Sequence, residues 1–138
     1  MNILFFLKPK HEIAWIYDNS TIKQALEKMR HHGFSAIPVI DRAGRYSGTL
    51  SEGDLLWEVL DGPADNLAKD KRRIKDILKG RQNAPVNVNE SIEDLFLMAV
   101  HQNFIPVEDD RGLFIGIVTR GDILQFYHQK MQREQNCD

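Results

Sequence analysis

The residues with the clearest chemical potential lie at 116–122, where the chain reads Gly-Ile-Val-Thr-Arg-Gly-Asp. A β-branched apolar pair leads into a hydroxyl residue and an apolar helical pattern follows, which predicts a strand that turns into a helix. The first N–H groups of a helix lack partners within it and carry partial positive charge, which suits a phosphate. Thr119 and Arg120 would add donors. The carboxylate of Asp122 has two acceptor oxygens for a pair of sugar hydroxyls.

The same pattern also fits an ordinary helix cap, because an N-cap Ser or Thr hydroxyl accepts a hydrogen bond from the backbone of the first turn. One isolated occurrence would favour the cap. A second copy, Gly-Thr-Leu-Ser-Glu-Gly-Asp at 48–54, changes that balance. It places Ser51 and Asp54 where the other copy has Thr119 and Asp122.

The two stretches belong to an internal repeat. From Ile37 on, an offset of 68 residues brings Asp54 onto Asp122 and one Ile-Pro-Val tripeptide onto another. Upstream the offset becomes 70, which brings Ile22 onto Ile92 and places a two-residue deletion in the second copy. A repeat of this length is one structural unit used twice.

Each unit predicts the order strand, helix, strand, strand, helix. Apolar residues recur at i, i+3, i+4 and i+7 from Ile22 and from Ile92, which is the pattern of a half-buried helix. Thr21 with Gln24 fits a capping box at the start of the first helix. The expected strands include 13–17, 37–40 and 104–107, and the turns after the last two lie at 41–44 and 109–112.

This order, the Ile-Pro-Val strands and the duplicated Gly-x-x-Ser/Thr-x-x-Asp motif resemble a tandem pair of cystathionine-β-synthase (CBS) domains, or Bateman module, of the stand-alone bacterial type. The resemblance runs from Trp15 to Tyr127. It implies an α+β fold of two pseudo-symmetric β-α-β-β-α repeats packed together. The expected domains are 1–67, the N-terminal segment with the first repeat, and 68–138, a linker helix with the second repeat and the tail.

The resemblance also implies a function. It predicts a regulatory module without catalytic activity that binds an adenine nucleotide (AMP, ADP or ATP) in the cleft between the repeats and signals to a partner protein. The residues that match the family's ribose sites are Asp54 and Asp122, and those that match its phosphate sites are Ser51, Thr119 and Arg120. The base would lie against Ser20, Ile22, Ile37, Pro38, Ile92, Ile105 and Pro106.

Two of these assignments have alternatives in the residues themselves. Ser20 fits a capping role as well as a ligand role. The residue directly after the motif hydroxyl also differs in charge between the copies, since Glu52 would repel a phosphate where Arg120 would attract it. We therefore expect the Thr119–Asp122 site to be occupied and the Ser51–Asp54 site to be weaker or empty.

Where many family members carry a basic residue aimed at phosphate, this chain has Ser35-Ala36 and Asn103-Phe104, which weakens the case for a triphosphate. Cyclic di-AMP is an alternative ligand, because the stretch 103–110 is similar to that of small family members that bind it. Those receptors can lack the ribose Asp that is present here. A scaffold that kept the fold and lost the ligand is a second alternative.

Composition limits the remaining classes of function. The 138 residues are 42% hydrophobic with a net charge of -2, which fits a globular domain that is no general polyanion binder. One cysteine, Cys137, excludes an internal disulfide and fits the cytoplasm. The apolar stretch 3–7 is too short to span a bilayer. No Gly-rich phosphate loop, Cys–His pair or metal-ligand cluster is present, so neither an enzyme nor a metal site is expected.

Two further stretches point to surfaces. The helix at 55–60 is too apolar for one buried face, and the resemblance predicts that it contributes to a homodimer. The basic run Lys69–Arg81 could be a nucleic-acid patch, but no aromatic residues are interleaved with its charges. A solvated linker helix at 73–78 explains the basic run better. A third interpretation is that some of its basic side chains contact the phosphates of a ligand.

Overall fold

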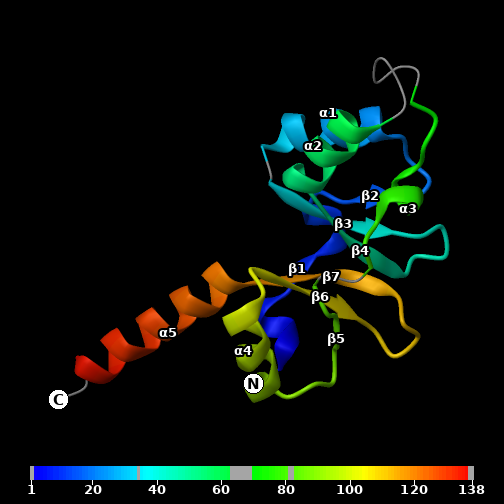
Figure 1. Cartoon of the computed structure of the whole chain (residues 1–138). Helices are drawn as coiled ribbons and strands as arrows, with labels where there is room; N and C mark the ends of the chain where they lie inside the picture. Colours follow the sequence, from blue (N-terminus) through cyan, green and yellow to red (C-terminus); the bar gives the residue numbers. More distant parts are fainter. Residues whose placement is uncertain (1, 34, 63–69, 81–82, 137–138) are drawn as a thin grey trace. The chain divides into compact units, whose positions relative to one another are not determined.

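The computed structural model describes residues 2–33, 35–62, 70–80 and 83–136. They form two compact units, each built around one of the predicted repeats (Figure 1). The repeat-1 unit is Glu12–Gln82, and the repeat-2 unit is Met1–His11 with Asn83–Asp138. Both units combine helices with a mixed sheet, so the predicted α+β class and the order β-α-β-β-α are confirmed.

The repeat-1 unit has a three-stranded sheet in the order β2-β3-β4. Strand β2 is parallel to β3, and β3 is antiparallel to β4. Its elements are β2 (Ile16–Tyr17), α1 (Ile22–His32), β3 (Ala36–Ile40), β4 (Tyr46–Ser51), α2 (Glu52–Asp61) and α3 (Ile74–Ile77).

The repeat-2 unit has a four-stranded sheet in the order β1-β7-β6-β5. Strands β5 and β6 are parallel, while β7 is antiparallel to both β6 and β1. The N-terminal elements are η1 (Ile3–Phe6), β1 (Lys8–Pro9) and η2 (Lys10–Glu12), whose last residue already belongs to the repeat-1 unit. The others are β5 (Val86–Asn87), α4 (Ile92–His101), β6 (Phe104–Glu108), β7 (Phe114–Thr119) and α5 (Arg120–Gln135).

Local signals in the sequence account for where the first helix begins and ends. The Thr21 hydroxyl accepts from the Gln24 N–H at 3.1 Å and the Gln24 side chain accepts from the Thr21 N–H at 2.9 Å, so the predicted capping box is confirmed. Gly33 ends the helix with φ 69°, a left-handed conformation that is open to glycine. The predicted strand at 13–17 is correct only for Ile16–Tyr17.

Each unit has its own hydrophobic core between sheet and helices. In the repeat-1 unit the helical face of α1 packs on Ile37, Val39 and Leu50 of the sheet. In the repeat-2 unit Ile105, Val107 and Val118 play the same part under α4 and α5. The strand residues between these, such as Pro38, point to the other face because side chains alternate along a strand.

The compact units differ from the predicted division at residue 67 in two places. The N-terminal segment, predicted to accompany the first repeat, pairs with the second: Lys8 lies opposite Ile117 in the β1–β7 ladder. The linker helix, predicted to accompany the second repeat, adds Ile74 and Ile77 to the core of the first. Long-range pairing and burial decide both placements, and neither is encoded by local pattern.

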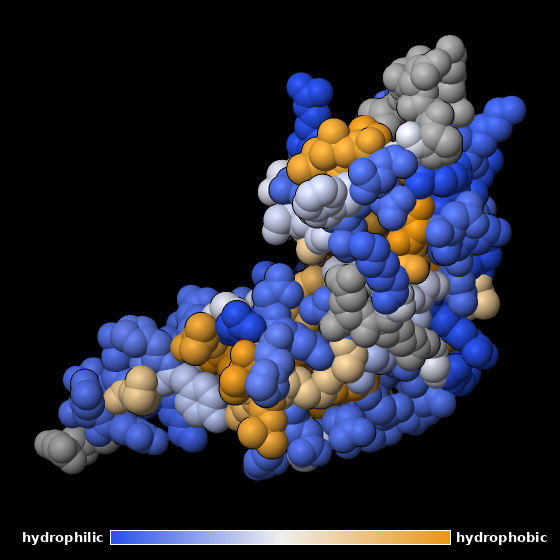
Figure 2. Space-filling view, in the orientation of Figure 1, coloured by the Kyte–Doolittle hydropathy of each residue, from blue (hydrophilic) through white to orange (hydrophobic). Residues whose placement is uncertain are grey.

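Several large apolar side chains remain at the surface of the helices. Figure 2 shows apolar surface over α2 and over α4 with the start of α5. The exposed residues there are Leu56, Trp57, Val59, Leu60, Leu97, Val100 and Leu124. In the part of the chain that the structure describes, no helix has both the length and the apolar character needed to cross a membrane.

Candidate functional site

The two motif copies adopt the same local structure at the junctions β4–α2 and β7–α5. The Ser51 hydroxyl accepts from the Asp54 N–H, and the Thr119 hydroxyl accepts from the Asp122 N–H, each at 3.1 Å. Both residues are therefore N-caps, as the capping interpretation predicts. A hydroxyl keeps further hydrogen-bonding capacity after it accepts one bond, so capping leaves a role toward phosphate open.

The backbone just after each hydroxyl is already paired. The Glu52 N–H donates to the Ser35 carbonyl at 2.9 Å, and the Arg120 N–H donates to the Asn103 carbonyl at 3.0 Å. These bonds remove one free donor from each helix start. They also place Ser35 and Asn103, next to which the resemblance leads us to expect a basic side chain, directly beside the motif.

Arg120, predicted to bind phosphate, is anchored to its own unit. Its Nε donates to the carbonyl oxygen of Ala99 at 2.7 Å, near the end of α4. A cation is favourable there because helix ends of this kind expose carbonyl oxygens with partial negative charge. This bond uses one of the five guanidinium donors. The other donors of Arg120 can still make the phosphate contact that the sequence predicts.

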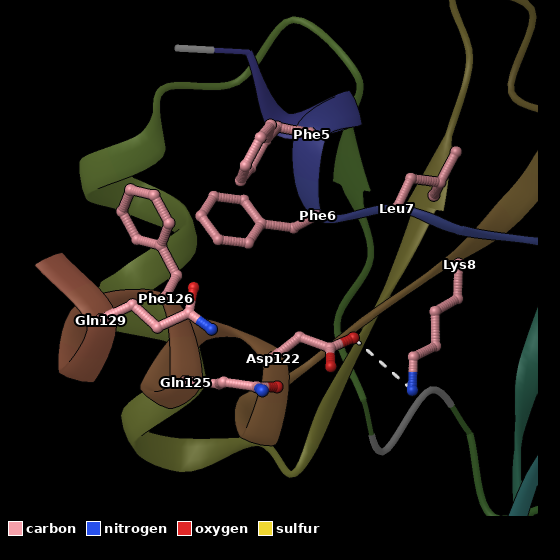
Figure 3. Close-up of a pocket in the computed structure, with 8 residues that line it drawn as sticks. All are labelled: Phe5, Phe6, Leu7, Lys8, Asp122, Gln125, Phe126 and Gln129. Carbon is pink, nitrogen blue, oxygen red and sulfur yellow. Dashed lines mark ion pairs between the residues drawn. The ribbon is translucent and has the colours of Figure 1, made fainter.

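Asp122 forms an ion pair that the sequence did not predict. Lys8 Nζ lies 3.5 Å from Asp122 Oδ2, and both side chains are part-exposed. The pair sits in a hollow of about 350 Å³ between the N-terminal segment and the start of α5 (Figure 3). The hollow is lined by Phe5, Phe6, Leu7, Lys8, Asp122, Gln125, Phe126 and Gln129.

The aromatic part of this hollow is built from edge-to-face contacts. Phe6 lies at the centre, with ring centroids 5.3 Å from Phe5, 6.1 Å from Phe96 and 5.2 Å from Phe126. Such contacts add to the burial energy of the rings. The cluster attaches the N-terminal segment to α4 and α5, and Figure 3 shows Lys8 reaching from the end of that segment to Asp122.

The Asp54 copy has different surroundings. Among the residues that the structure describes, Asp54 takes part in no ion pair, and the acidic Glu52 stands beside it in the first turn of α2. The hollow next to this helix, about 470 Å³, is predominantly apolar and does not include Asp54. It is lined by Leu26, Met29, Arg30, Glu52, Leu55, Leu56 and Val59.

The predicted base-binding residues fall into two sets, one in each unit, and each set combines buried core residues with side chains on the other face of the sheet. Ile22, Ile37 and Ile105 are fully buried members of the two cores. Their strand neighbours Pro38 and Pro106 point to the opposite sheet faces, because side chains alternate along a strand. Ile92 is partly buried against the repeat-2 core.

Ser20 precedes the helix cap and is not the cap itself, so the capping alternative for this residue is wrong. Thr21 is the N-cap of α1. The Ser20 carbonyl accepts from the Ile74 N–H at 2.9 Å, which ties the start of α1 to the linker helix. Ser20 also lines a shallow hollow with Trp15, Tyr17 and Gln24.

Several residues of the basic run form ion pairs and hydrogen bonds inside the repeat-1 unit. Arg72 binds the carboxylates of Asp70 and Glu58, and the hydrogen bond from Arg72 lowers the pKa of Asp70 against the effect of burial. The Arg73 N–H donates to the Asp76 carboxylate at 2.8 Å. These bonds agree with the linker interpretation. The ends of the run, Lys69 and Arg81, lie outside the described residues, as does Cys137.

An aspartate side chain closes each of the two predicted turns. Asp109 Oδ1 accepts from the N–H groups of Arg111 and Leu113 at 2.9 and 3.0 Å. Asp41 does the same for Ala43 and Arg45 in the first copy, both at 2.9 Å. The predicted turns are confirmed. Over the described ranges no cluster of three or more His, Cys, Asp or Glu could hold a metal ion.

Solved structures of the same fold bind adenine nucleotides. CbpB in complex with c-di-AMP superimposes with a TM-score of 0.89 at 23% identity, covering 99% of this chain and 90% of that one. CBSX2 in complex with AMP superimposes with a TM-score of 0.73 at 23% identity, covering 94% and 98%. At this level of identity the likeness concerns the fold.

Curated relatives include both small proteins and parts of large ones. The CBS domain-containing protein YhcV of Bacillus subtilis is 31% identical over 115 residues, covering 81% of this chain and 76% of YhcV. The A-adding tRNA nucleotidyltransferase of Aquifex aeolicus is 32% identical over 116 residues, but the chain spans only 13% of that enzyme.

The family comparison agrees with the internal repeat. The model of the CBS domain matches twice, at residues 7–61 and 74–129. Each match contains one copy of the motif and one Ile-Pro-Val strand. The chain therefore belongs to the CBS domain family, with two CBS domains in tandem.

Proposed function

We propose that this chain is a regulatory module that senses an adenine nucleotide through its second motif, with the ribose held by Asp122 and a phosphate by Thr119 and Arg120. The observation that carries the proposal is the placement of Asp122 at the start of α5, half-exposed, beside a hollow and paired with a cation. AMP-bound CBSX2 has the same fold, which supports a nucleotide of this class.

The first motif is the weaker site in this proposal. Its carboxylate stands next to Glu52 rather than next to an arginine, and no ion pair of Asp54 is found in the described part of the repeat-1 unit. Two carboxylates near one phosphate repel it. AMP, ADP and ATP are the candidate ligands, and the missing basic residues at 35–36 and 103–104 favour fewer phosphates.

Cyclic di-AMP is the second candidate, favoured by the close likeness of the fold to CbpB in complex with that ligand. Both candidates contain adenine, ribose and phosphate, and they differ in whether free ribose hydroxyls are available to Asp122. Cyclic di-AMP uses the 3′ oxygen of each ribose in its phosphodiester, so it offers a carboxylate only single hydroxyls.

A thermal-shift screen with AMP, ADP, ATP and cyclic di-AMP tests the proposal on three proteins: the parent, Asp122→Asn and the matched control Asp54→Asn. A ligand at 100 times its dissociation constant stabilises by roughly 2.7 kcal/mol. We expect one adenine ligand to stabilise the parent and Asp54→Asn, and to lose its effect on Asp122→Asn. Stabilisation that survives in Asp122→Asn would contradict the ribose assignment, and no shift with any ligand would favour a ligand-free scaffold.

The exposed apolar faces suggest how the signal leaves the module. We infer that they are covered in a homodimer, and that ligand binding shifts the equilibrium between states with different affinity for a regulated protein. Leu97 and Val100 lie on one exposed face of α4, since residues three apart are neighbours on a helix. The double variant Leu97→Lys/Val100→Lys should sediment as a smaller species than the parent, whereas Lys130→Glu on the polar surface of α5 should not.

A further inference from the structure

We propose that Lys8 of the N-terminal segment is a binding residue of the Asp122 site and makes this site selective for phosphate-bearing nucleotides over uncharged nucleosides. The proposal rests on the proposed function, in which Asp122 holds the ribose. Lys8 lies outside both motif copies, and in this proposal it determines which class of ligand the site binds.

The N-terminal segment is held firmly enough to position a side chain. Ile3 and Phe6 are buried in the core of the repeat-2 unit, and Leu7 packs against it. Strand β1 then pairs with β7, with Lys8 opposite Ile117 and Pro9 opposite Gly116. Lys8 therefore projects from a folded strand that is the direct neighbour of the strand leading into the motif.

Gly116 permits this approach of β1. A Cβ at Gly116 would overlap the carbonyl oxygen of Lys8 and would stand 2.9 Å from Leu7 Cδ1. Its φ of 155° is also one that residues with a side chain rarely adopt. The corresponding Gly48 of the other repeat lies against the Gly80 carbonyl and Leu78, so a different segment of the chain takes this place in the first copy.

The ion pair leaves donors and acceptors for a ligand. Lys8 Nζ carries three donors and lies 3.5 Å from Asp122 Oδ2, which leaves donors of the ammonium and Oδ1 of the carboxylate for a ligand. The side chains of Lys8 and Asp122 are 47% and 34% exposed, so both groups are reachable (Figure 3). A ribose hydroxyl can donate to the carboxylate while a phosphate oxygen accepts from the ammonium.

Charge gives this arrangement its selectivity. A lone carboxylate that holds the ribose would repel the phosphate attached to the same sugar. Lys8 cancels that charge, and Arg120 in the same first turn of α5 adds a further cation. An uncharged nucleoside makes no use of the ammonium, whereas a nucleotide does. A purely structural role is a poor alternative explanation, because ion pairs this exposed contribute little to stability.

The test measures the affinity of the full chain for AMP, cyclic di-AMP and adenosine by titration calorimetry, with adenosine also measured by competition. The variants are Lys8→Met, which removes the charge at similar length, Lys8→Arg, which keeps the charge, and the control Lys130→Met on α5. We expect Lys8→Met to lower the affinity for the bound nucleotide at least tenfold and the affinity for adenosine less than twofold. Lys8→Arg and Lys130→Met should stay within threefold of the parent for all ligands.

If Lys8→Met loses affinity equally for nucleotide and adenosine, or loses it for neither, the proposed role of Lys8 is overturned. An Asp122→Asn arm separates this failure from that of the proposed function. If Asp122→Asn loses binding while Lys8→Met keeps the parent's selectivity, only the Lys8 proposal fails. If the parent binds none of the three ligands, or Asp122→Asn binds as the parent does, the ribose assignment fails and the Lys8 proposal fails with it.

Discussion

Replacement of Arg72 by alanine should destabilise the repeat-1 unit strongly, because this guanidinium joins the end of α2 to the chain that precedes α3. Its Nε and Nη2 donate to the two carboxylate oxygens of Asp70 at 3.1 and 2.9 Å. Its Nη1 donates to Glu58 Oε2 at 2.7 Å, and its Nη2 also donates to the Glu58 carbonyl oxygen at 3.0 Å. The bidentate contact with Asp70 is a strong form of ion pair.

The magnitude follows from burial. The Asp70 side chain is only 5% exposed, so Arg72→Ala leaves a buried carboxylate whose remaining donor among the described residues is the backbone N–H of residue 72. Removal of one partner of a buried ion pair costs roughly 3–5 kcal/mol. The side chains of Arg72 and Glu58 are 27% and 24% exposed, and water reaching them lowers the loss. We expect about 3 kcal/mol, near the low end of that range.

The assay is urea unfolding followed by tryptophan fluorescence. Both tryptophans, Trp15 and Trp57, lie in the repeat-1 unit, so the signal reports this unit. The control is Arg45→Ala in an exposed turn, which should change stability by less than about 0.5 kcal/mol. A loss below about 1 kcal/mol in Arg72→Ala would refute the argument from burial.

A double-mutant cycle assigns the loss to the pair. Asp70→Asn keeps the shape and one acceptor while it removes the charge that Arg72 balances. If the stability cost of Arg72→Ala arises from the unpaired carboxylate, the double variant Asp70→Asn/Arg72→Ala should lose less unfolding free energy than the two single variants lose together. Residues in one network couple by about 0.5–3 kcal/mol, and strict additivity here would show that Arg72 acts independently of Asp70.

The remaining predictions concern acid stability and the N-terminal segment. The hydrogen bond from Arg72 lowers the pKa of Asp70 below its usual 3.8, so the stabilisation is complete above the pKa of the unfolded chain and is lost as the pH falls through the lower folded value. Asp70→Asn should flatten this part of the acid-unfolding curve measured between neutral pH and pH 3. Phe6→Ala should cost about 3–5 kcal/mol in calorimetric unfolding, because a buried ring with three aromatic neighbours is removed; a Tm equal to that of the parent would contradict this. Gly116→Ala should speed amide hydrogen exchange across residues 3–9, while Gly121→Ala, where a Cβ meets nothing within 4 Å, should not.

Sequence reasoning reached the parts of the structure that local pattern encodes. The 68-residue offset between Asp54 and Asp122 identified the repeat, and the spacing of Thr21 and Gln24 identified the cap of α1. Turn chemistry placed the turn at Asp109, where side-chain oxygen and backbone N–H groups are only a few residues apart. Each of these contacts is made within one short stretch, so residue type and spacing were sufficient.

The parts that were missed depend on contacts far apart in the chain. Lys8 meets Ile117 through a strand of two residues, too short to show any alternation. Arg72 stood in a run of charges that gave no sign of which one pointed inward. The base-binding assignment stays a prediction; Ile37 and Pro38 are consecutive in a strand, so their side chains lie on opposite faces.

The comparison of the two motif copies shows where their difference arises. The caps of α2 and α5 have the same geometry, with Ser51 and Thr119 each accepting from the backbone of the following Asp at 3.1 Å. The difference in electrostatics comes from the neighbours: Glu52 in one copy, and Arg120 with Lys8 in the other. Lys8 lies at the start of the first family match, residues 7–61, but it pairs with the sheet of the second repeat. A segment that precedes one repeat in the sequence and packs on the other can therefore give one of two similar junctions a charge balance of its own.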